Sequence, residues 1–215
     1  MPKASNKTRK RRGAPKREVH CQDAIPWLAA RPAKLDAIVT SIPEMEEVGL
    51  KPAPYEEFYR RAVRLCLDAV KPAGYVIFLQ TDRKHHGWID KSYLAIDEAV
   101  KAGSRLIWHK IALRMEPGKR DLFRPGYSHM LCFSKEGKVG TLLPDVIERG
   151  EVAYTHAFGA AAVKMVVEYL REQGIRHITD PFVGSGTTLR AAAAAGLDST
   201  GLDIDPKQCR EARRA

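Results

Sequence analysis

The stretch Asp180-Pro-Phe-Val-Gly-Ser-Gly-Thr-Thr-Leu189 decides the fold that this sequence predicts. Apolar residues precede it and an alanine-rich run follows it, a pattern typical of a strand, a tight turn and a helix. Because Gly184 and Gly186 carry no side chain, ligand atoms can approach the turn, and its N–H groups are expected to hold an anion at the helix N-terminus. Thr187 and Thr188 add hydroxyl donors in the first helical turn.

A second strand is predicted at residues 199–204, and it ends in Asp203-Ile-Asp205. In nucleotide-binding folds, an acidic residue at the tip of the next strand binds a ribose diol. The glycine spacing is not Gly-x-Gly-x-x-Gly, so a dinucleotide is not indicated. The alternative is an ordinary strand, turn and helix without a ligand.

These two motifs resemble the S-adenosylmethionine site of the amino-methyltransferases that modify exocyclic amines of nucleic-acid bases. The family pattern is Asp-Pro-Phe-x-Gly-Ser-Gly-Thr, a helix, and then Gly-x-(Glu/Asp)-Ile-(Asn/Asp), and every position is met here. The resemblance implies S-adenosylmethionine as cofactor. It assigns the cofactor contacts to Asp180, Phe182, Gly184, Ser185, Gly186, Thr187, Asp203 and Asp205.

The length of 215 residues suits one α/β domain with a sizeable core. No apolar run reaches the length of a membrane span, so no membrane contact is expected. The four cysteines are scattered and form no Cys-x-x-Cys pair, which suits a reducing, intracellular compartment and predicts no metal site.

Strands alternate with helices along the chain, which predicts a parallel sheet with helices on both faces. Strands are predicted at residues 18–22, 35–41, 75–80, 105–113 and 127–134, in addition to those at the two motifs. Helices are predicted at residues 24–30, 55–70, 91–102 and 160–173. A loop at residues 71–74 is expected to separate the 55–70 helix from the 75–80 strand.

The resemblance extends over residues 18–213 and implies the circularly permuted, β-type order of motifs. It implies a Rossmann-like methyltransferase fold with a mostly parallel, seven-stranded sheet. The catalytic half would span residues 18–135, a small recognition insert residues 136–155, and the cofactor half residues 156–215. Asp23 and His156 match two further cofactor contacts of the family. The 35–41 strand is then expected beside the 178–182 strand, so that Ser41 and Gly184 face one cleft.

The family's catalytic tetrapeptide is (Asp/Asn/Ser)-Pro-Pro-(Tyr/Phe/Trp), and this chain has Ser41-Ile42-Pro43-Glu44 in its place. In that motif a side-chain oxygen and a backbone carbonyl accept the two N–H bonds of the amine and aim its nitrogen at the methyl group. The aromatic residue stacks on the flipped base. By resemblance, Ser41, Pro43 and Glu44 are the catalytic candidates.

The departure at Ile42 and Glu44 leaves several interpretations open. Glu44 could accept a hydrogen bond from the base, with Tyr55, Phe58 or Trp88 stacking instead. The chain could use another acceptor, or be a non-catalytic, nucleic-acid-binding subunit. Glu44 could also be a solvated loop acid, like its neighbours Glu46 and Glu47.

A basic loop with interleaved aromatic residues suits contact with nucleic-acid phosphates. Its cations are Arg114, Lys119, Arg120 and Arg124, beside Phe123 and Tyr127, which could equally be packing residues. His85 and His86 follow the 75–80 strand, where a solvated loop is the simpler interpretation. DNA is the expected partner, RNA stays open, and the chain could work as a homodimer or with a partner subunit.

The net charge of +10 is concentrated at the N-terminus, because residues 1–17 contain eight Lys and Arg, among them Arg11 and Arg12, and no acid. Such a segment cannot bury apolar area, and a disordered basic arm is expected. It could neutralise phosphates, act as a nuclear address, or be a passive tail. An address would direct the protein to the nucleus. If the protein is prokaryotic or viral, a cytoplasmic location is expected.

If the arm contacts phosphates, deleting residues 1–17 will weaken nucleic-acid binding and flatten its salt dependence. Each lost phosphate contact should lower the slope of log K against log salt by about 0.9 on duplex DNA. Fluorescence anisotropy at several salt concentrations measures both quantities. An unchanged slope would leave the arm as an address or a tail.

Overall fold

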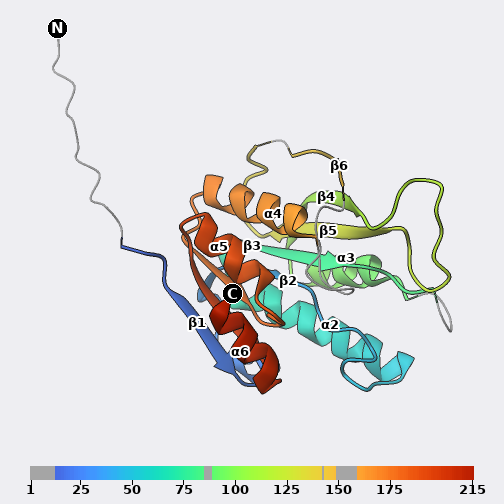
Figure 1. The fold of residues 1–215 in the computed structure, drawn as a ribbon, viewed down its shortest axis with the longest axis horizontal. Helices are drawn as coiled ribbons and strands as arrows, with labels where there is room; N and C mark the ends of the chain where they lie inside the picture. The colour runs from blue at the N-terminus through green and yellow to red at the C-terminus, as the bar shows by residue number, and fades with distance from the viewer. Residues whose placement is uncertain (1–12, 85–88, 142, 149–158) are drawn as a thin grey trace, which may run out of the picture.

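A computed structural model describes residues 13–84, 89–141, 143–148 and 159–215 of the chain. Its centre is an eight-stranded sheet in the order β1-β8-β7-β2-β3-β5-β4-β6 (Figure 1). The strands are β1 (Arg17–Cys21), β2 (Leu35–Thr40), β3 (Val70–Gln80), β4 (Arg105–Leu113), β5 (Tyr127–Ser134), β6 (Val146–Ile147), β7 (His177–Asp180) and β8 (Asp198–Asp203). Only β5 runs antiparallel to its neighbours among these strands.

Six helices accompany the sheet in the described residues: α1 (Ala24–Ala29), α2 (Pro52–Ala69), α3 (Lys91–Lys101), α4 (Ala160–Glu172), α5 (Thr187–Ala194) and α6 (Pro206–Arg214). The apolar side chains of α2 and α3 pack with Ile38 and Phe78 on one face of the sheet. Those of α4 and α5 pack with Val39 and Ile77 on the other. Alternate residues of the central strands therefore enter opposite cores, as expected for a sheet covered on both sides.

The predicted α/β fold with a mostly parallel sheet is confirmed, but the strand count of seven is wrong. The additional strand is β6, which has two residues and lies within the predicted 136–155 insert. It pairs with β4. The loop predicted at residues 71–74 is also wrong, because β3 begins at Val70 and is continuous to Gln80. The helix predicted at residues 55–70 begins earlier, at Pro52. Proline is favoured at this position because the first turn of a helix does not use its backbone N–H groups, so the missing N–H of proline costs no hydrogen bond.

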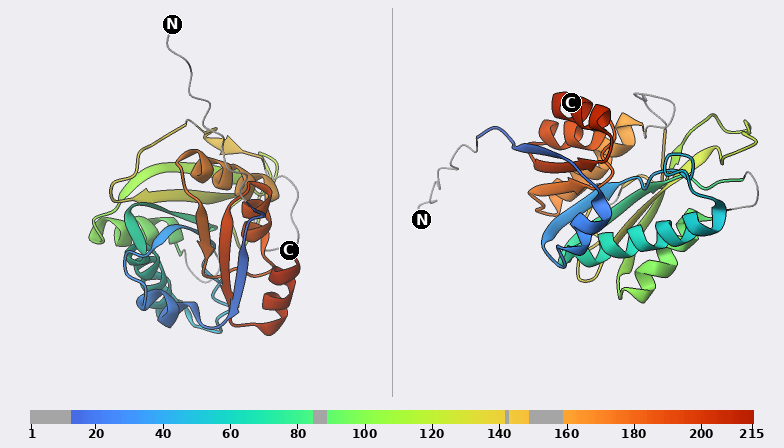
Figure 2. Two further views of the ribbon diagram at one scale, coloured as in Figure 1. Left: turned by 90° about the vertical axis from the view of Figure 1, so that its left-hand side faces the viewer. Right: turned by 90° about the horizontal axis from the view of Figure 1, so that it is seen from below.

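The two halves of the chain meet where β2 lies parallel to β7, with Ile38 opposite Thr179. The predicted adjacency of these two strands is confirmed. At the edge of the sheet, β1 pairs with β8, so the beginning and end of the described chain lie side by side (Figure 2). The division of the domain into catalytic half, insert and cofactor half stays a prediction, and the basic arm lies largely outside the described residues.

No helix in the described ranges combines the length and apolarity that crossing a bilayer requires.

Gly201 on β8 tests how closely the strand and the glycine turn are packed. An added Cβ would lie 2.8 Å from Cγ2 of Val183 and 3.1 Å from Cδ2 of Leu189. Gly201→Ala should therefore lower the free energy of unfolding by about 1–3 kcal/mol, the usual cost of overpacking. Urea unfolding measures this change.

Ser199 on the same strand provides a matched control. It is buried, and its hydroxyl makes no hydrogen bond within the described residues. Removal of that unsatisfied group by Ser199→Ala should leave the stability within about 0.5 kcal/mol of wild type or raise it. Equal stability of the two variants would contradict the close packing at Gly201.

Candidate active site

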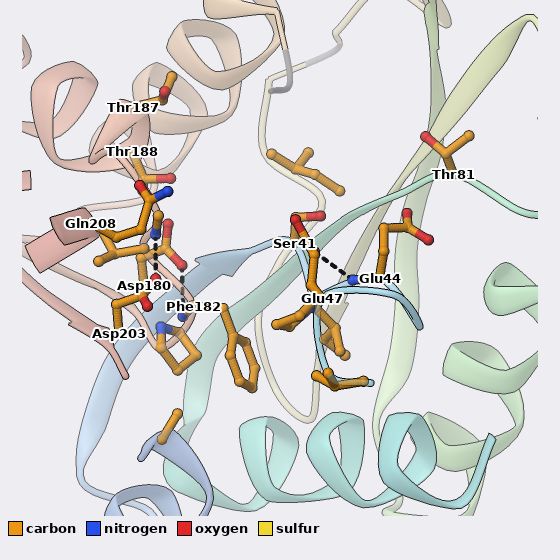
Figure 3. Close-up of a pocket in the computed structure, with 18 of the residues that line it drawn as sticks. Ser41, Glu44, Glu47, Thr81, Asp180, Phe182, Thr187, Thr188, Asp203 and Gln208 are labelled. Carbon is orange, nitrogen blue, oxygen red and sulfur yellow. Dashed lines mark hydrogen bonds between the residues drawn. The ribbon is translucent and has the colours of Figure 1, made fainter. Parts of the chain in front are cut away.

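A cavity of about 770 Å³ opens at the carboxyl ends of β7, β8, β2 and β3. Ligands of open α/β sheets bind at this edge, where neighbouring strands lead their connections to opposite sides. Twelve of the residues predicted from the sequence line the cavity: Asp23, Ser41, Pro43, Glu44, Arg114, Arg124, Asp180, Phe182, Gly184, Thr187, Asp203 and Asp205. In the view of Figure 3, Ser41 lies between the group around Asp180 and Asp203 and the side chain of Glu44.

Four predicted residues lie away from this cavity. Ser185 lines a separate surface hollow, and Gly186 is buried where a Cβ would lie 2.9 Å from Cα of Ala212. Lys119 and Arg120 are exposed on the loop between β4 and β5. The predicted residues His156, Arg11 and Arg12, like His85, His86 and Trp88, fall outside the described residues.

The glycine turn is fastened to the end of β8. The N–H of Gly184 donates to Oδ2 of Asp203 at 3.1 Å, and the N–H of Asp205 donates to Oδ1 of the same carboxylate at 2.8 Å. The N–H of Gly186 donates to the carbonyl of Val183. Both glycine amides are therefore used within the protein, and anion binding by the N–H groups of the turn stays a prediction. The carboxylate of Asp203 keeps lone pairs that can still accept from a ligand.

Asp180 is a buried carboxylate at the end of β7. Its Oδ1 accepts from the hydroxyl of Thr40 at 2.7 Å and from the N–H of Phe182 at 3.2 Å. Burial raises the pKa of Asp180 to about 6, although its hydrogen bonds with Thr188, Thr40 and Phe182 oppose this rise. A group that titrates near neutrality inside a cavity is typical of functional sites.

The tetrapeptide Ser41-Ile42-Pro43-Glu44 follows β2 and is held by packing. Ile42 is 1% exposed and packs in the core with α2. Burial of this side chain fixes the backbone at the position where the resembling family has its first proline. Tyr55 is fully buried and donates its hydroxyl to the carbonyl of Pro43 at 3.0 Å. The Ser41 side chain is exposed to the cavity, and its hydroxyl has no hydrogen-bond partner in the described residues.

Glu44 is held by two buried cations. Its Oε1 accepts from Nζ of Lys91 at 2.8 Å, and its Oε2 lies 3.8 Å from the Arg83 guanidinium. The Lys91 side chain is fully buried, which lowers its pKa, while the charge of Glu44 opposes the shift. The interpretation of Glu44 as a solvated acid is therefore wrong. Glu46, which also contacts Arg83, is largely exposed.

Several cavity residues were not predicted as site residues. Thr81 and Ser128 form a hydroxyl pair 2.6 Å apart across β3 and β5, and both stand at strand ends where a sequence search could have found them. Phe58 lines the cavity, while Tyr55, the other described candidate for stacking, is buried. Arg61 and Gln208 also line the cavity. Both are polar residues of helices, and the sequence of a helix does not show which of its polar residues face a site.

The raised pKa of Asp180 predicts a pH-dependent stability. The folded state binds this proton more tightly than the unfolded chain, whose carboxyl titrates near 3.8. Stability from this group is therefore full below about pH 4, falls by about 2–3 kcal/mol as the pH rises through about 6, and is level above. Urea unfolding at pH 4 and pH 7.5 should show this loss in wild type relative to Asp180→Asn. A constant difference between the two proteins would contradict it.

Residues 148–214 match the family model described as DNA methylase. No curated protein sequence matches the chain. Among solved structures, TTHA0409, a putative DNA modification methylase from Thermus thermophilus, is similar with a TM-score of 0.69 and 20% identity over 92% of this chain and 93% of that one. A structure of TTHA0409 complexed with S-adenosyl-L-methionine has a TM-score of 0.70 at 19% identity, covering 92% of each chain.

The cytosine-N4-specific PvuII DNA methyltransferase has a TM-score of 0.75 at 12% identity, over 93% of this chain and 86% of that one. At these identities the structural matches show a shared fold. The family match covers the glycine turn and the Asp203 strand, whose residues meet at the cavity described above. Residues 148–214 are thus similar to the DNA methylase family, and the chain shares its fold with TTHA0409 and the PvuII DNA methyltransferase.

Proposed function

We propose that the chain is an S-adenosylmethionine-dependent DNA methyltransferase that modifies an exocyclic amine of a base. One observation carries the proposal. A single cavity contains both the exposed Ser41 hydroxyl and the residues of the glycine turn and Asp203. Its volume of about 770 Å³ lies within the usual range for small-molecule sites.

The residues that line the cavity fit the cofactor. Asp203 can accept from the ribose hydroxyls, because its two oxygens each receive only one backbone N–H bond. Asp180 is placed to attract the positively charged methionine end, and binding there would favour its ionised form. Gly184 gives that end close access to the turn backbone. When bound, S-adenosylmethionine supplies an electrophilic methyl group on a sulfonium.

Ser41 and Ile42 can position the acceptor amine. The lone pair of an exocyclic amine is delocalised into its ring, so the nitrogen needs acceptors that favour a pyramidal geometry. The Ser41 hydroxyl oxygen can accept one N–H bond. The carbonyl of Ile42, which accepts no hydrogen bond within the described residues, can accept the other. The Pro43 carbonyl is already bonded to Tyr55 and is a poorer candidate.

Glu44 contributes to the site by fixing the loop beside Ser41. Its carboxylate neutralises Lys91, and its own N–H donates to Oε2 of Glu47 at 2.6 Å. Stacking on the base is therefore supplied by another residue, and Phe58 is the described candidate that lines the cavity. Arg114 and Arg124, which also line it, are suited to contacts with phosphate.

Two single substitutions separate cofactor binding from methyl transfer. Ser41→Ala should reduce transfer of labelled methyl to DNA about a hundredfold and leave cofactor affinity unchanged, because it removes a positioning group. Asp203→Ala should weaken cofactor binding measured by calorimetry. Mass spectrometry of nucleosides from the treated DNA identifies the product, and RNA treated in parallel tests the other substrate class.

The proposal would be wrong if wild type binds cofactor and DNA but methylates no nucleic acid, because that result describes a binding subunit. A product found only in RNA would replace the DNA substrate. If Asp203→Ala binds S-adenosylmethionine as wild type does, the assignment of the cofactor site fails.

A further inference from the structure

The cavity extends from Ser41 to a part of α2 that the family match does not include. Phe58 and Arg61 stand nearly one turn apart on this helix, and both line the cavity. Residues three apart on a helix share one face, so a ring and a guanidinium lie on the same side of α2. Phe182 and Val48 line the cavity as well, which makes this region partly apolar.

Arg61 differs from the neighbouring arginines in its charge environment. Arg60 pairs with Glu56, Asp97 and Glu98, and Arg64 pairs with Glu98. Arg61 has neither an ion pair nor a hydrogen bond within the described residues, and its side chain is exposed. Two arginines of α2 are therefore paired with carboxylates, whereas the third makes no such pair and faces the cavity.

A ring beside a guanidinium is suited to a nucleotide. Bases stack on aromatic side chains, and a guanidinium binds phosphate through paired hydrogen bonds. The anionic group of S-adenosylmethionine is its carboxylate, which the motif resemblance assigns to the end held by Asp180 and the glycine turn. A phosphate comes only from the nucleic-acid strand, and an exposed cation at the cavity is within reach of such a strand.

We propose that Arg61 and Phe58 form a nucleotide-binding subsite on α2, in which Arg61 binds a backbone phosphate and Phe58 stacks on a base of the substrate strand. This inference rests on the proposed function, which already names Phe58 for stacking, and adds Arg61 as a phosphate contact beside it. Arg114 and Arg124 line the same cavity from the loop between β4 and β5. The strand is thus contacted by cations of two elements while Ser41 faces the acceptor.

Arg61→Gln tests the phosphate contact. Binding of a fluorescent single-stranded DNA oligonucleotide should weaken about threefold to tenfold at low salt, and the slope of log K against log salt should fall by about 0.7. Cofactor affinity by calorimetry should not change. Arg64→Gln removes the same charge one turn away, where it pairs with Glu98, and should change the salt slope little.

Phe58→Leu tests the stacking contact. It should weaken oligonucleotide binding and leave the salt slope as in wild type, because no charge is removed. Circular dichroism shows whether each variant is folded. The proposal is overturned if Arg61→Gln binds the oligonucleotide as wild type does, or if it loses affinity for S-adenosylmethionine alone. A wild-type protein that binds no nucleic acid would overturn both this proposal and the proposed function.

Discussion

The parallel pairing of β2 with β7 is the contact on which the rest of the site depends. Directly across it, the hydroxyl of Thr40 donates to the buried carboxylate of Asp180, which lies 140 positions further along the chain. Because parallel strands end at the same edge, Ser41 and the glycine turn emerge side by side. Neither half of the chain forms the cavity alone, so this pairing is what makes one site of two sequence motifs.

Much of the fold could be predicted because its signals are local. The strands of the central sheet are apolar runs, and the helices of residues 91–101 and 160–172 end at glycines with positive φ. The two-residue strand β6 has no such signal, since it exists through two register contacts with β4. The loop predicted at residues 71–74 is wrong because Pro72 and Gly74 favour a turn locally, whereas pairing within the sheet keeps β3 extended through them.

The site was predictable where a motif required particular residues, and less so where tertiary contacts decide. Twelve predicted residues line the cavity, and most of them stand at or just beyond the carboxyl ends of strands. The environment of Glu44 depends on Lys91, 47 positions away, and on Arg83, which no local pattern connects to it. The N–H groups of Gly184 and Gly186 bond to an aspartate on the next strand and to a carbonyl within the turn, contacts that no local pattern indicates.

The buried pair of Glu44 and Lys91 has a consequence for how this sequence could have diverged. Loss of Glu44 alone would leave the fully buried ammonium of Lys91 without its carboxylate partner. Removing one partner of a buried ion pair costs about 3–5 kcal/mol. Loss of Lys91 alone would leave the carboxylate beside Arg83 only. An evolutionary change between Ser-Ile-Pro-Glu and a tetrapeptide that ends in an aromatic residue therefore passes through a destabilised protein unless positions 44 and 91 change together. The two residues form an epistatic unit, inherited or replaced as one.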